Sequence, residues 1–309
     1  MKKKEKDGSS LTSRIWHARY IYLLILPVMI WIAVFCYGPM YGVVLAFKDY
    51  NARLGILGSE WVGLKHFKRI FITPEAIRSI KNTFIISGGR LIIEFPIPII
   101  LAILFAEMPG TKVKKLYQTI LTFPHFLSWI VVSAVMLNFF ANKGAVNVLL
   151  SNMGMKTVDF FGSTLLARPM LYLSSIWKEV GWGSIIFVAA IAGIDPTLYE
   201  AAKIDGASKL RQIWHITLTG IRATILVMLI LKVGHVMNAG FDQVFNLRNG
   251  VTTNAIQILD TYIYDITFLA TPNYGFSTAV GLFKNVINLT LMLVANKVTH
   301  IISGEKMIG

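Results

Sequence analysis

The sequence predicts an all-helical, polytopic membrane protein with six transmembrane helices. The chain has 309 residues, of which 55% are hydrophobic and only 15% are charged. Its mean hydropathy is +0.61, whereas about a quarter of the residues of a typical soluble domain are charged. Apolar runs long enough to cross a bilayer, which takes about 20 residues, recur along the whole chain. They lie at about 20–47, 81–106, 114–140, 168–194, 214–238 and 276–303.

The first run follows a basic N-terminal segment that contains four lysines within residues 2–6, then Arg14 and Arg19. A basic start before an apolar run also occurs in cleaved signal peptides. Here the run is long, and the sequence YGPMYG at 37–42 stands where a small-residue cleavage site would be expected. We therefore predict an uncleaved first span.

The distribution of Lys and Arg favours cytoplasmic termini, because cytoplasmic segments of membrane proteins are enriched in these residues. This orientation places the segments 48–80, 141–167 and 239–275 outside. The external segment 48–80 is itself basic, so the bias is modest. The formal net charge of +14 indicates contact with anionic lipid head groups rather than with nucleic acid, because the basic residues form no single stripe.

Within the first external segment, apolar residues recur at helical spacing between basic ones. They are Trp61, Leu64, Phe67, Ile70 and Phe71. This pattern predicts an amphipathic helix that lies on the outer membrane surface. A soluble loop with a small core is the alternative.

The cytoplasmic segment at about 195–213 has clear helix boundaries. Asp195 is a favoured N-cap residue and Pro196 fits the first helical position. Gly206 can adopt the left-handed conformation that ends a helix, and a second helix is expected from Ser208. The small residues around Ala201 form a surface that another protein can approach closely. An ordinary connection between two spans is the alternative.

The order of residues in this segment resembles the EAA loop of importer permeases that depend on a binding protein. Glu200-Ala201-Ala202, three residues, Gly206, nine residues and Ile216-Thr217-Leu218 match that pattern. Thr219 departs from it, because the family has proline there, and the local kink is therefore in doubt. The sequences YGPMYG at 37–42, AFKDY at 46–50 and WVGL at 61–64 look like the polysaccharide-type branch of these permeases.

The resemblance implies the fold of the maltose and methionine importer permeases, with residues 1–309 as one permease domain in the cell membrane. It also implies a heterodimer with a second related permease, two cytoplasmic ATP-binding subunits and an external solute-binding protein that delivers an oligosaccharide. The positions that would couple to the ATPase are Glu200, Ala201, Ala202, Asp205, Gly206 and Ala207. The sequence lacks the Gly-x-x-x-x-Gly-Lys motif that cradles phosphates. We therefore expect the partner subunits, and not this chain, to bind ATP and Mg.

Polar residues within the apolar runs are functional candidates, because charge in the bilayer is costly. Arg90 can pair with Glu94 at i, i+4, and Lys178 can pair with Glu179; substrate contact is the alternative for the first pair. Two polar stripes at helical spacing, on spans five and six, predict a shared hydrophilic path, and Trp182 could stack on a sugar face. Trp177 could also stack on a sugar or anchor at the membrane interface. The predicted path consists of Trp182, Lys232, His235, Asn238, Lys284, Asn285 and Asn288, with Asp242, Ser277 and Gly281 continuing the stripes.

Two other functions are compatible with a polytopic chain. A secondary transporter would use an intramembrane carboxylate such as Glu94 or Glu179, but such transporters usually contain inverted repeats, and none is visible here. A membrane enzyme would need a catalytic constellation, and none stands out. No metal site is visible either. The glycines of Gly181-Trp182-Gly183 are interpreted as helix-packing contacts.

Overall fold

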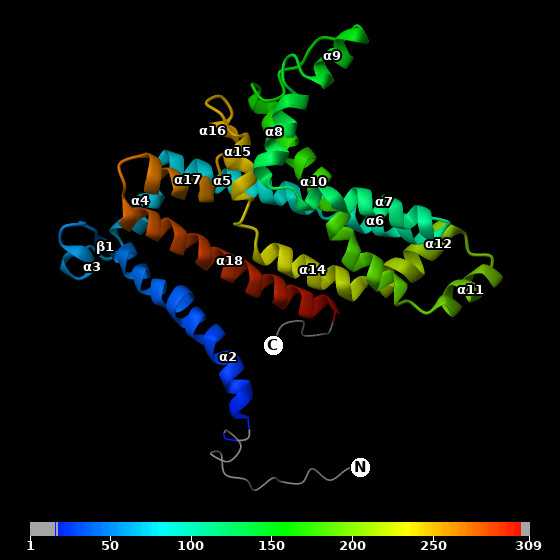
Figure 1. Cartoon of the computed structure of the whole chain (residues 1–309), viewed down its shortest axis with the longest axis horizontal. Coiled ribbons are helices and arrows are strands. Elements are labelled where there is room, and N and C mark those ends of the chain that lie inside the picture. The colour runs from blue at the N-terminus through cyan, green and yellow to red at the C-terminus, as the bar shows by residue number, and fades with distance from the viewer. Residues whose placement is uncertain (1–15, 17, 304–309) are drawn as a thin grey trace.

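Figure 1 shows the computed structural model, which describes residue 16 and residues 18–303, without the side chains of residues 299–303. The basic cluster predicted at residues 2–6 and Arg14 lie outside the described residues. Nearly all described elements are helices, so the all-helical fold class is confirmed. Within the described residues, four helices are long and apolar enough to cross a membrane, and two bent helix pairs bring the number to six.

The first span is one apolar rod that matches the predicted run 20–47, and its N-terminal part projects away from the other helices (Figure 1). It changes its helical pitch along its length. The successive parts are the α-helix α2 (Arg19–Ile32), the π-helix η1 (Ala33–Tyr37) and the 3-10 helix η2 (Gly38–Phe47). None of the residues of α2 is buried, so lipid or another protein must cover this helix in the membrane. The last part, η2, packs along the C-terminal helix α18 (Tyr274–Ser303).

The first external segment does not contain the single surface helix that was predicted around 61–71. Its short elements are β1 (Lys48–Asp49), α3 (Gly55–Gly58), β2 (Glu60–Trp61) and α4 (Lys65–Ile70). Trp61 pairs with Lys48 in an antiparallel ribbon and stacks on Phe47 at 5.6 Å between ring centroids. Gly63 has a φ of 58°, which interrupts any helix that would run through it. His66 and Ile70 are buried, and Ile70 packs into a core with Leu259 and Phe276, so the segment is neither the predicted surface helix nor a loop with a core of its own.

The second span runs from Pro74 to Glu107 and begins earlier than the predicted residue 81. It consists of α5 (Pro74–Gly89), the π-helix η3 (Arg90–Glu94) and α6 (Pro96–Glu107). Pro96 has no backbone N–H, so the helix must widen or kink next to it. The π-helical turn lies directly before this proline. π-Helical turns inside α-helices are frequently found at functional sites.

The third span is not the straight helix that was predicted at 114–140. The helix α7 (Thr111–Thr122) continues into the 3-10 turn η4 (Phe123–Phe126), and α8 (Trp129–Phe139) then leaves at a bend of 103° (Figure 1). Two local features cause the bend. Pro124 removes a helical hydrogen-bond donor, and Ser128 starts a new helix by accepting the Val131 N–H at 3.4 Å.

The fourth span, α10 (Thr164–Ala192), is the central helix and agrees with the predicted 168–194. It packs along α6 on one side and along α7 on another. The sixth span, α18, agrees with the predicted 276–303. Between α8 and α10, the external segment carries a short helix, α9 (Ala145–Asn152), whose Asn147 side chain bonds to the backbone of Ala141 and Val158.

The fifth span is bent by 62° and ends earlier than predicted. Its parts are α12 (Lys209–Gln212), the π-helix η5 (Ile213–Thr217), α13 (Leu218–Gly220) and α14 (Arg222–Gly234). Residues 235–240 are not helical, which corrects the prediction of a helical stripe through Asn238 and Asp242. The chain then forms four short elements in the segment that was predicted to be external. These are α15 (Phe241–Leu247), α16 (Thr253–Ile256), α17 (Leu259–Tyr264) and η6 (Asp265–Leu269).

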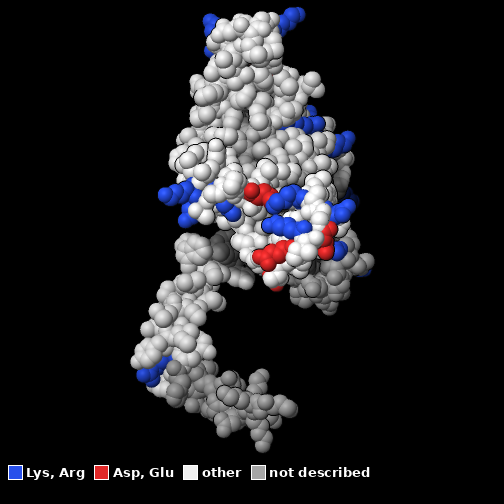
Figure 2. All heavy atoms as spheres, turned by 90° about the vertical axis from the view of Figure 1, so that its right-hand side faces the viewer, with Lys and Arg blue, Asp and Glu red and all other residues white. Residues whose placement is uncertain are grey.

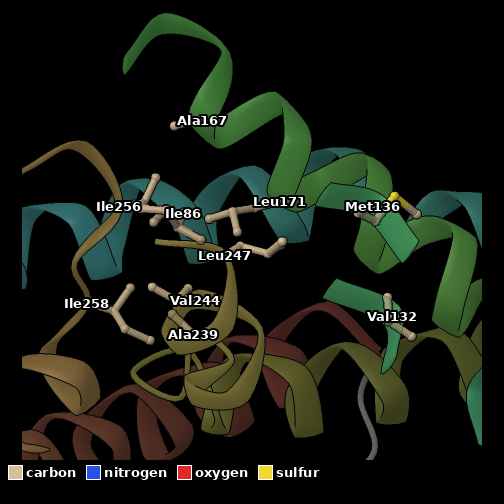
Figure 3. Packing of buried hydrophobic residues seen from close by; sticks show 10 residues of the cluster. All are labelled: Ile86, Val132, Met136, Ala167, Leu171, Ala239, Val244, Leu247, Ile256 and Ile258. Carbon is tan, nitrogen blue, oxygen red and sulfur yellow. The ribbon is translucent and has the colours of Figure 1, made fainter. Parts of the chain in front are cut away.

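The short elements after α14 are anchored in a core between long helices. Figure 3 shows buried apolar side chains of this core, which come from α5, α8, α10 and the segment 239–258. Val244 and Leu247 of α15 lie among them, opposite Ile86 and Leu171. Burial of these apolar side chains against one another stabilises the packing of the segment on the long helices. The segment 239–275, which was predicted to be external, is therefore a folded part of the bundle and not an open loop.

Candidate functional site

The segment between spans four and five forms a short helix with the predicted boundaries. The helix α11 runs Pro196–Ile204, and the Asp195 carboxylate accepts the Thr197 N–H at 2.9 Å. This hydrogen bond from the Thr197 backbone lowers the pKa of Asp195, since it favours the ionised carboxylate. Gly206 has a φ of 72°, the left-handed conformation predicted for it. Both helix signals of the sequence are confirmed.

The turn after α11 is held in one conformation by hydrogen bonds. Ser208 caps α12, as predicted, and the Gln212 side chain donates to the Ala207 carbonyl at 2.9 Å. Two further contacts connect α11, the turn and α12, together called the helix–turn unit, with the long helices. The Tyr199 hydroxyl lies 2.9 Å from the Thr217 hydroxyl, and Lys209 pairs with Glu107 at the end of α6 at 2.5 Å. The first contact joins α11 to span five, and the second joins span five to span two.

The bend expected near Thr219 is present without a proline. Span five turns by 62° between Gly220 and Arg222, after the π-helical turn η5 and the short helix α13. The Thr219 hydroxyl donates to the Trp214 carbonyl at 3.4 Å, and side chains that bond back into a helix commonly bend it. The departure from the family pattern at this position does not remove the kink.

The surface of the helix–turn unit is open to a partner. Glu200, Ala201, Asp205 and Gly206 are exposed, and Ile204 is 87% exposed. Beside it, a groove of about 300 Å³ is lined by Ala202, Ala207 and five residues of 205–216. Figure 2 views the molecule from the end that carries α11 and shows both signs of charge gathered there. The exposed surface of α11 thus offers an apolar side chain and charged groups that a partner protein could contact.

A cavity of about 370 Å³ lies between the long helices, near the middle of spans two and four. Charged and aromatic side chains line it together with apolar ones. The polar and aromatic lining residues are Arg90, Glu94, Phe95, Trp129, Ser175, Glu179, Trp182, Phe187 and Lys232. The ring of Trp182 stacks on His125 at 4.4 Å between centroids, with 2° between the ring planes. This environment can bind a ligand that offers both hydroxyl groups and ring faces.

A second, smaller cavity of about 110 Å³ shares Arg90 and Lys232 with the first. His235 and Asn238, from the irregular stretch after α14, line it as well. The structure thus places Trp182, Lys232, His235 and Asn238 around two adjacent cavities. Four of the seven residues predicted for the path lie together.

The chain matches the family model of the binding-protein-dependent transport system inner membrane component over residues 96–300. The chain belongs to this family. A curated relative, the polygalacturonan/rhamnogalacturonan transport system permease protein YteP of Bacillus subtilis (strain 168), is 45% identical over 96% of this chain and 92% of the relative. Protein LplB of the same organism is 41% identical over 94% of this chain and 91% of its own length.

Solved structures agree with this assignment. A chain of a bacterial ABC transporter involved in the import of the acidic polysaccharide alginate superposes with a TM-score of 0.88 at 36% identity, covering 95% of the permease and 99% of that chain. A chain of a bacterial alginate transporter in complex with an alginate pentasaccharide-bound periplasmic protein gives 0.89 at 35% identity, covering 97% and 100%. The predicted importer-permease fold is confirmed.

The predicted intramembrane ion pairs of the permease are present. Arg90 lies 3.6 Å from Glu94, and Lys178 lies 3.1 Å from Glu179. Each pair has additional partners that the sequence did not indicate. Arg90 also donates to Gln243, Glu94 accepts from Ser175 at 2.9 Å, and Glu179 bonds to His125 at 2.7 Å.

The polar residues of span six have structural partners or face away from the two cavities. Lys284 pairs with Asp260 at 2.5 Å, and the Asn288 oxygen accepts the Met237 N–H at 2.9 Å. Asn285 is exposed. Within the described residues, none of these three lines either cavity described above. In this chain the two predicted stripes therefore do not share one cavity.

We expect Asn288→Leu to lower the stability of the permease rather than to slow uptake selectively. The change leaves the backbone N–H of buried Met237 without its acceptor, which costs about 1–3 kcal/mol. The amount of folded permease in the membrane and its thermal midpoint would both fall. Asn285→Leu is the control, because the Asn285 side chain is exposed and lies one helical turn from Asn288 on α18. Normal accumulation of Asn288→Leu with reduced uptake would show instead that Asn288 faces the path.

Several residues of the site carry no signal in the sequence. His125 lies in an apolar stretch, and only the fold brings it against Trp182 and Glu179. Gln243 donates to Ser174 at 2.8 Å and to the Leu171 carbonyl, which fixes α15 against α10. Pro124 was the one sequence feature that pointed to this contact, because it marks the bend that places His125 beside Trp182. Among the described residues, no group of three metal-ligating side chains comes together.

Proposed function

We propose that this permease translocates an oligosaccharide that an external binding protein delivers, driven by ATP hydrolysis on partner subunits. The exposed, capped helix α11 carries this proposal, since it bonds to span five, which in turn pairs with span two. An isolated transporter chain has no need of such a rigid exposed unit. The relatives support the sugar class, because they are named as transporters of polygalacturonan, rhamnogalacturonan and alginate.

The proposed complex contains a second related permease, two cytoplasmic ATP-binding subunits and the solute-binding protein. Those ATP-binding subunits would hold ATP and Mg, and residues 1–309 would act as a single permease domain without a cofactor of its own. The apolar helix α2, which has no buried residue, is available for lipid or for the second permease. The similar alginate transporter forms a complex with a periplasmic protein, which supports an external binding protein here.

The coupling positions are Glu200, Ala201, Ala202, Asp205, Gly206 and Ala207. In the proposed mechanism, ATP-driven closure of the partner subunits pushes on α11. Hydrogen bonds and the Lys209–Glu107 ion pair pass the movement to the spans, which rock as units between two packed states. The two cavities around Lys232 then open to one side of the membrane and to the other in turn.

The external segments 141–167 and 239–275 are the proposed docking surface for the binding protein. The second of these is rigid enough to transmit docking. Arg248 forms a two-pronged ion pair with Asp265 at 2.6 and 2.7 Å, and the Asn82 side chain of α5 donates to the carbonyls of Asn254 and Gln257. Gln243 of the same segment bonds to α10 beside the large cavity. Docking and the cavity are thus mechanically connected.

Cysteine labelling tests the proposed orientation, with both termini cytoplasmic in the plasma membrane. In a Cys36→Ser background, a membrane-impermeant maleimide should label Asn152→Cys and Asn249→Cys from outside intact cells. Both positions are exposed on the proposed external side, whereas Asp205 lies in the proposed cytoplasmic turn. Asp205→Cys should react only after the cells are opened. Labelling of Asp205→Cys in intact cells would reverse the topology.

The proposed function is tested by reconstituting the permease with its partner permease, the ATP-binding subunit and the binding protein. ATP hydrolysis is expected to rise when the sugar-loaded binding protein is added, and only when the permease is present. A matched sample in which Ile204→Asp replaces the exposed apolar side chain of α11 should lose the ATP-binding subunit during purification. Hydrolysis that is the same with and without the permease would contradict the proposal.

A further inference from the structure

Nearly all charges around the large cavity have a partner. Arg90 pairs with Glu94 and donates to Gln243, while Glu94 also accepts from Ser175. Glu179 pairs with Lys178 and His125. The carboxylates of the wall are therefore occupied by groups of the protein. Charges inside a membrane protein are usually compensated in this manner, because an uncompensated one is costly.

Lys232 is the exception among the described charged residues that line the cavity. Its side chain is exposed and forms no ion pair within 4 Å. Glu94 is near enough to interact with it through space, but that carboxylate is already bound to Arg90 and Ser175. Lys232 borders both cavities. A cation thus faces the space through which the substrate would pass, and one positive charge of the wall is left without a counter-ion.

An aromatic platform lies on the wall of the same cavity. Trp182 is 47% exposed, and His125 stacks on one face of its indole ring, so the ring is held in a fixed orientation. His125 is fixed in turn by Glu179. Trp129, at the start of α8, adds a second indole to the lining. Aromatic rings of this kind contact the apolar faces of sugar rings, whereas a lysine attracts an anionic group as a compact point charge.

We propose that Lys232 selects acidic oligosaccharides by pairing with the carboxylate of a uronic acid unit while the sugar ring packs on Trp182. This inference rests on the proposed function, which it narrows from oligosaccharides in general to those that carry carboxylates. A single carboxylate matches the single uncompensated charge, and the hydroxyl groups of the same sugar unit can bond to the polar wall. A neutral sugar would leave Lys232 without a counter-ion inside the membrane.

The test compares uptake of trigalacturonate with uptake of its fully methyl-esterified form and of a neutral trisaccharide, in proteoliposomes containing the whole complex. Lys232→Gln should reduce trigalacturonate uptake about tenfold or more, because a charge-assisted bond is lost. It should leave uptake of the ester, complex assembly and binding-protein docking unchanged. Lys232→Arg should keep most of the uptake. Lys297→Gln is the matched control, since it removes an exposed lysine far from the cavity and should have no effect.

The outcomes separate this inference from the proposed function. Wild-type uptake of trigalacturonate by Lys232→Gln overturns the inference, and so does an equal loss for the acid and the ester. ATP-driven uptake of the neutral trisaccharide alone by the wild type overturns the inference and leaves the proposed function standing. If the wild type takes up none of the three sugars although the complex assembles and binds ATP, the proposed function falls together with the inference.

Discussion

Gly206→Val is expected to abolish most sugar uptake while the permease still inserts into the membrane. Gly206 has a φ of 72°, and an L-residue pays roughly 1–2 kcal/mol in this conformation, more when it is β-branched. No atom lies within 4 Å of the position of an added Cβ, so the change causes no clash inside the chain. Its effect is a different turn, and therefore a different direction of α11 relative to α12. The coupling surface would no longer fit its partner.

Membrane insertion, co-purification of the ATP-binding subunit and uptake should be measured in parallel. Gly206→Asn is the matched variant, because asparagine tolerates the left-handed conformation and should retain most of the uptake. Gly88→Val tests the size of the side chain alone, since it also meets no neighbour, has no positive φ and lies outside the proposed docking segments. Uptake by Gly206→Val at the wild-type rate would remove the basis for α11 as the coupling element.

Gly181→Val is expected to prevent accumulation of the folded permease. Gly181 is buried on α10 where that helix crosses α7, and a Cβ there would overlap the carbonyl group of Leu121. Backbone cannot move aside as a flexible side chain can. Overpacking of this kind typically costs about 1–3 kcal/mol and occasionally more. Because Trp182 and Glu179 flank this contact, a shift of α10 would also deform the large cavity.

The amount of permease extracted in monodisperse form is the direct readout for Gly181→Val. Gly281→Ala on α18 and Gly88→Ala on α5 serve as controls, because a Cβ at either position meets no atom within 4 Å. Both controls should accumulate as the wild type does. If Gly181→Val accumulates and transports normally, α7 and α10 do not pack as described. The prediction that this glycine is a packing contact would then be wrong.

The features that were predictable from the sequence are those with local causes. Asp195, Pro196, Gly206 and Ser208 mark helix ends through their own backbone preferences, and each acts as expected. The pair Arg90–Glu94 follows from spacing on one helix. The positions of spans one, four and six follow from hydropathy, which reports lipid contact directly.

The features that were not predictable depend on contacts between distant segments. Residues 114–140 were predicted as one span, yet the helix bends by 103° after Pro124. The fifth run was predicted to continue past Gly234, where α14 ends and the following turn bonds to Asn288 of α18. Equal spacing of polar residues suggested that Lys284 lines a path, but Asp260 lies beside it only in the folded chain. Likewise, the lack of a partner for Lys232 becomes visible only when its neighbours are known.

The energy source for uptake tests the central claim most directly. Proteoliposomes that contain the permease, its partner permease and the ATP-binding subunit should be loaded with ATP and given the sugar-charged binding protein. Uptake should require ATP inside, the ATP-binding subunit and the binding protein together, and it should be unaffected when proton and sodium gradients are dissipated. Uptake that is driven by an ion gradient in proteoliposomes without the ATP-binding subunit would contradict the account.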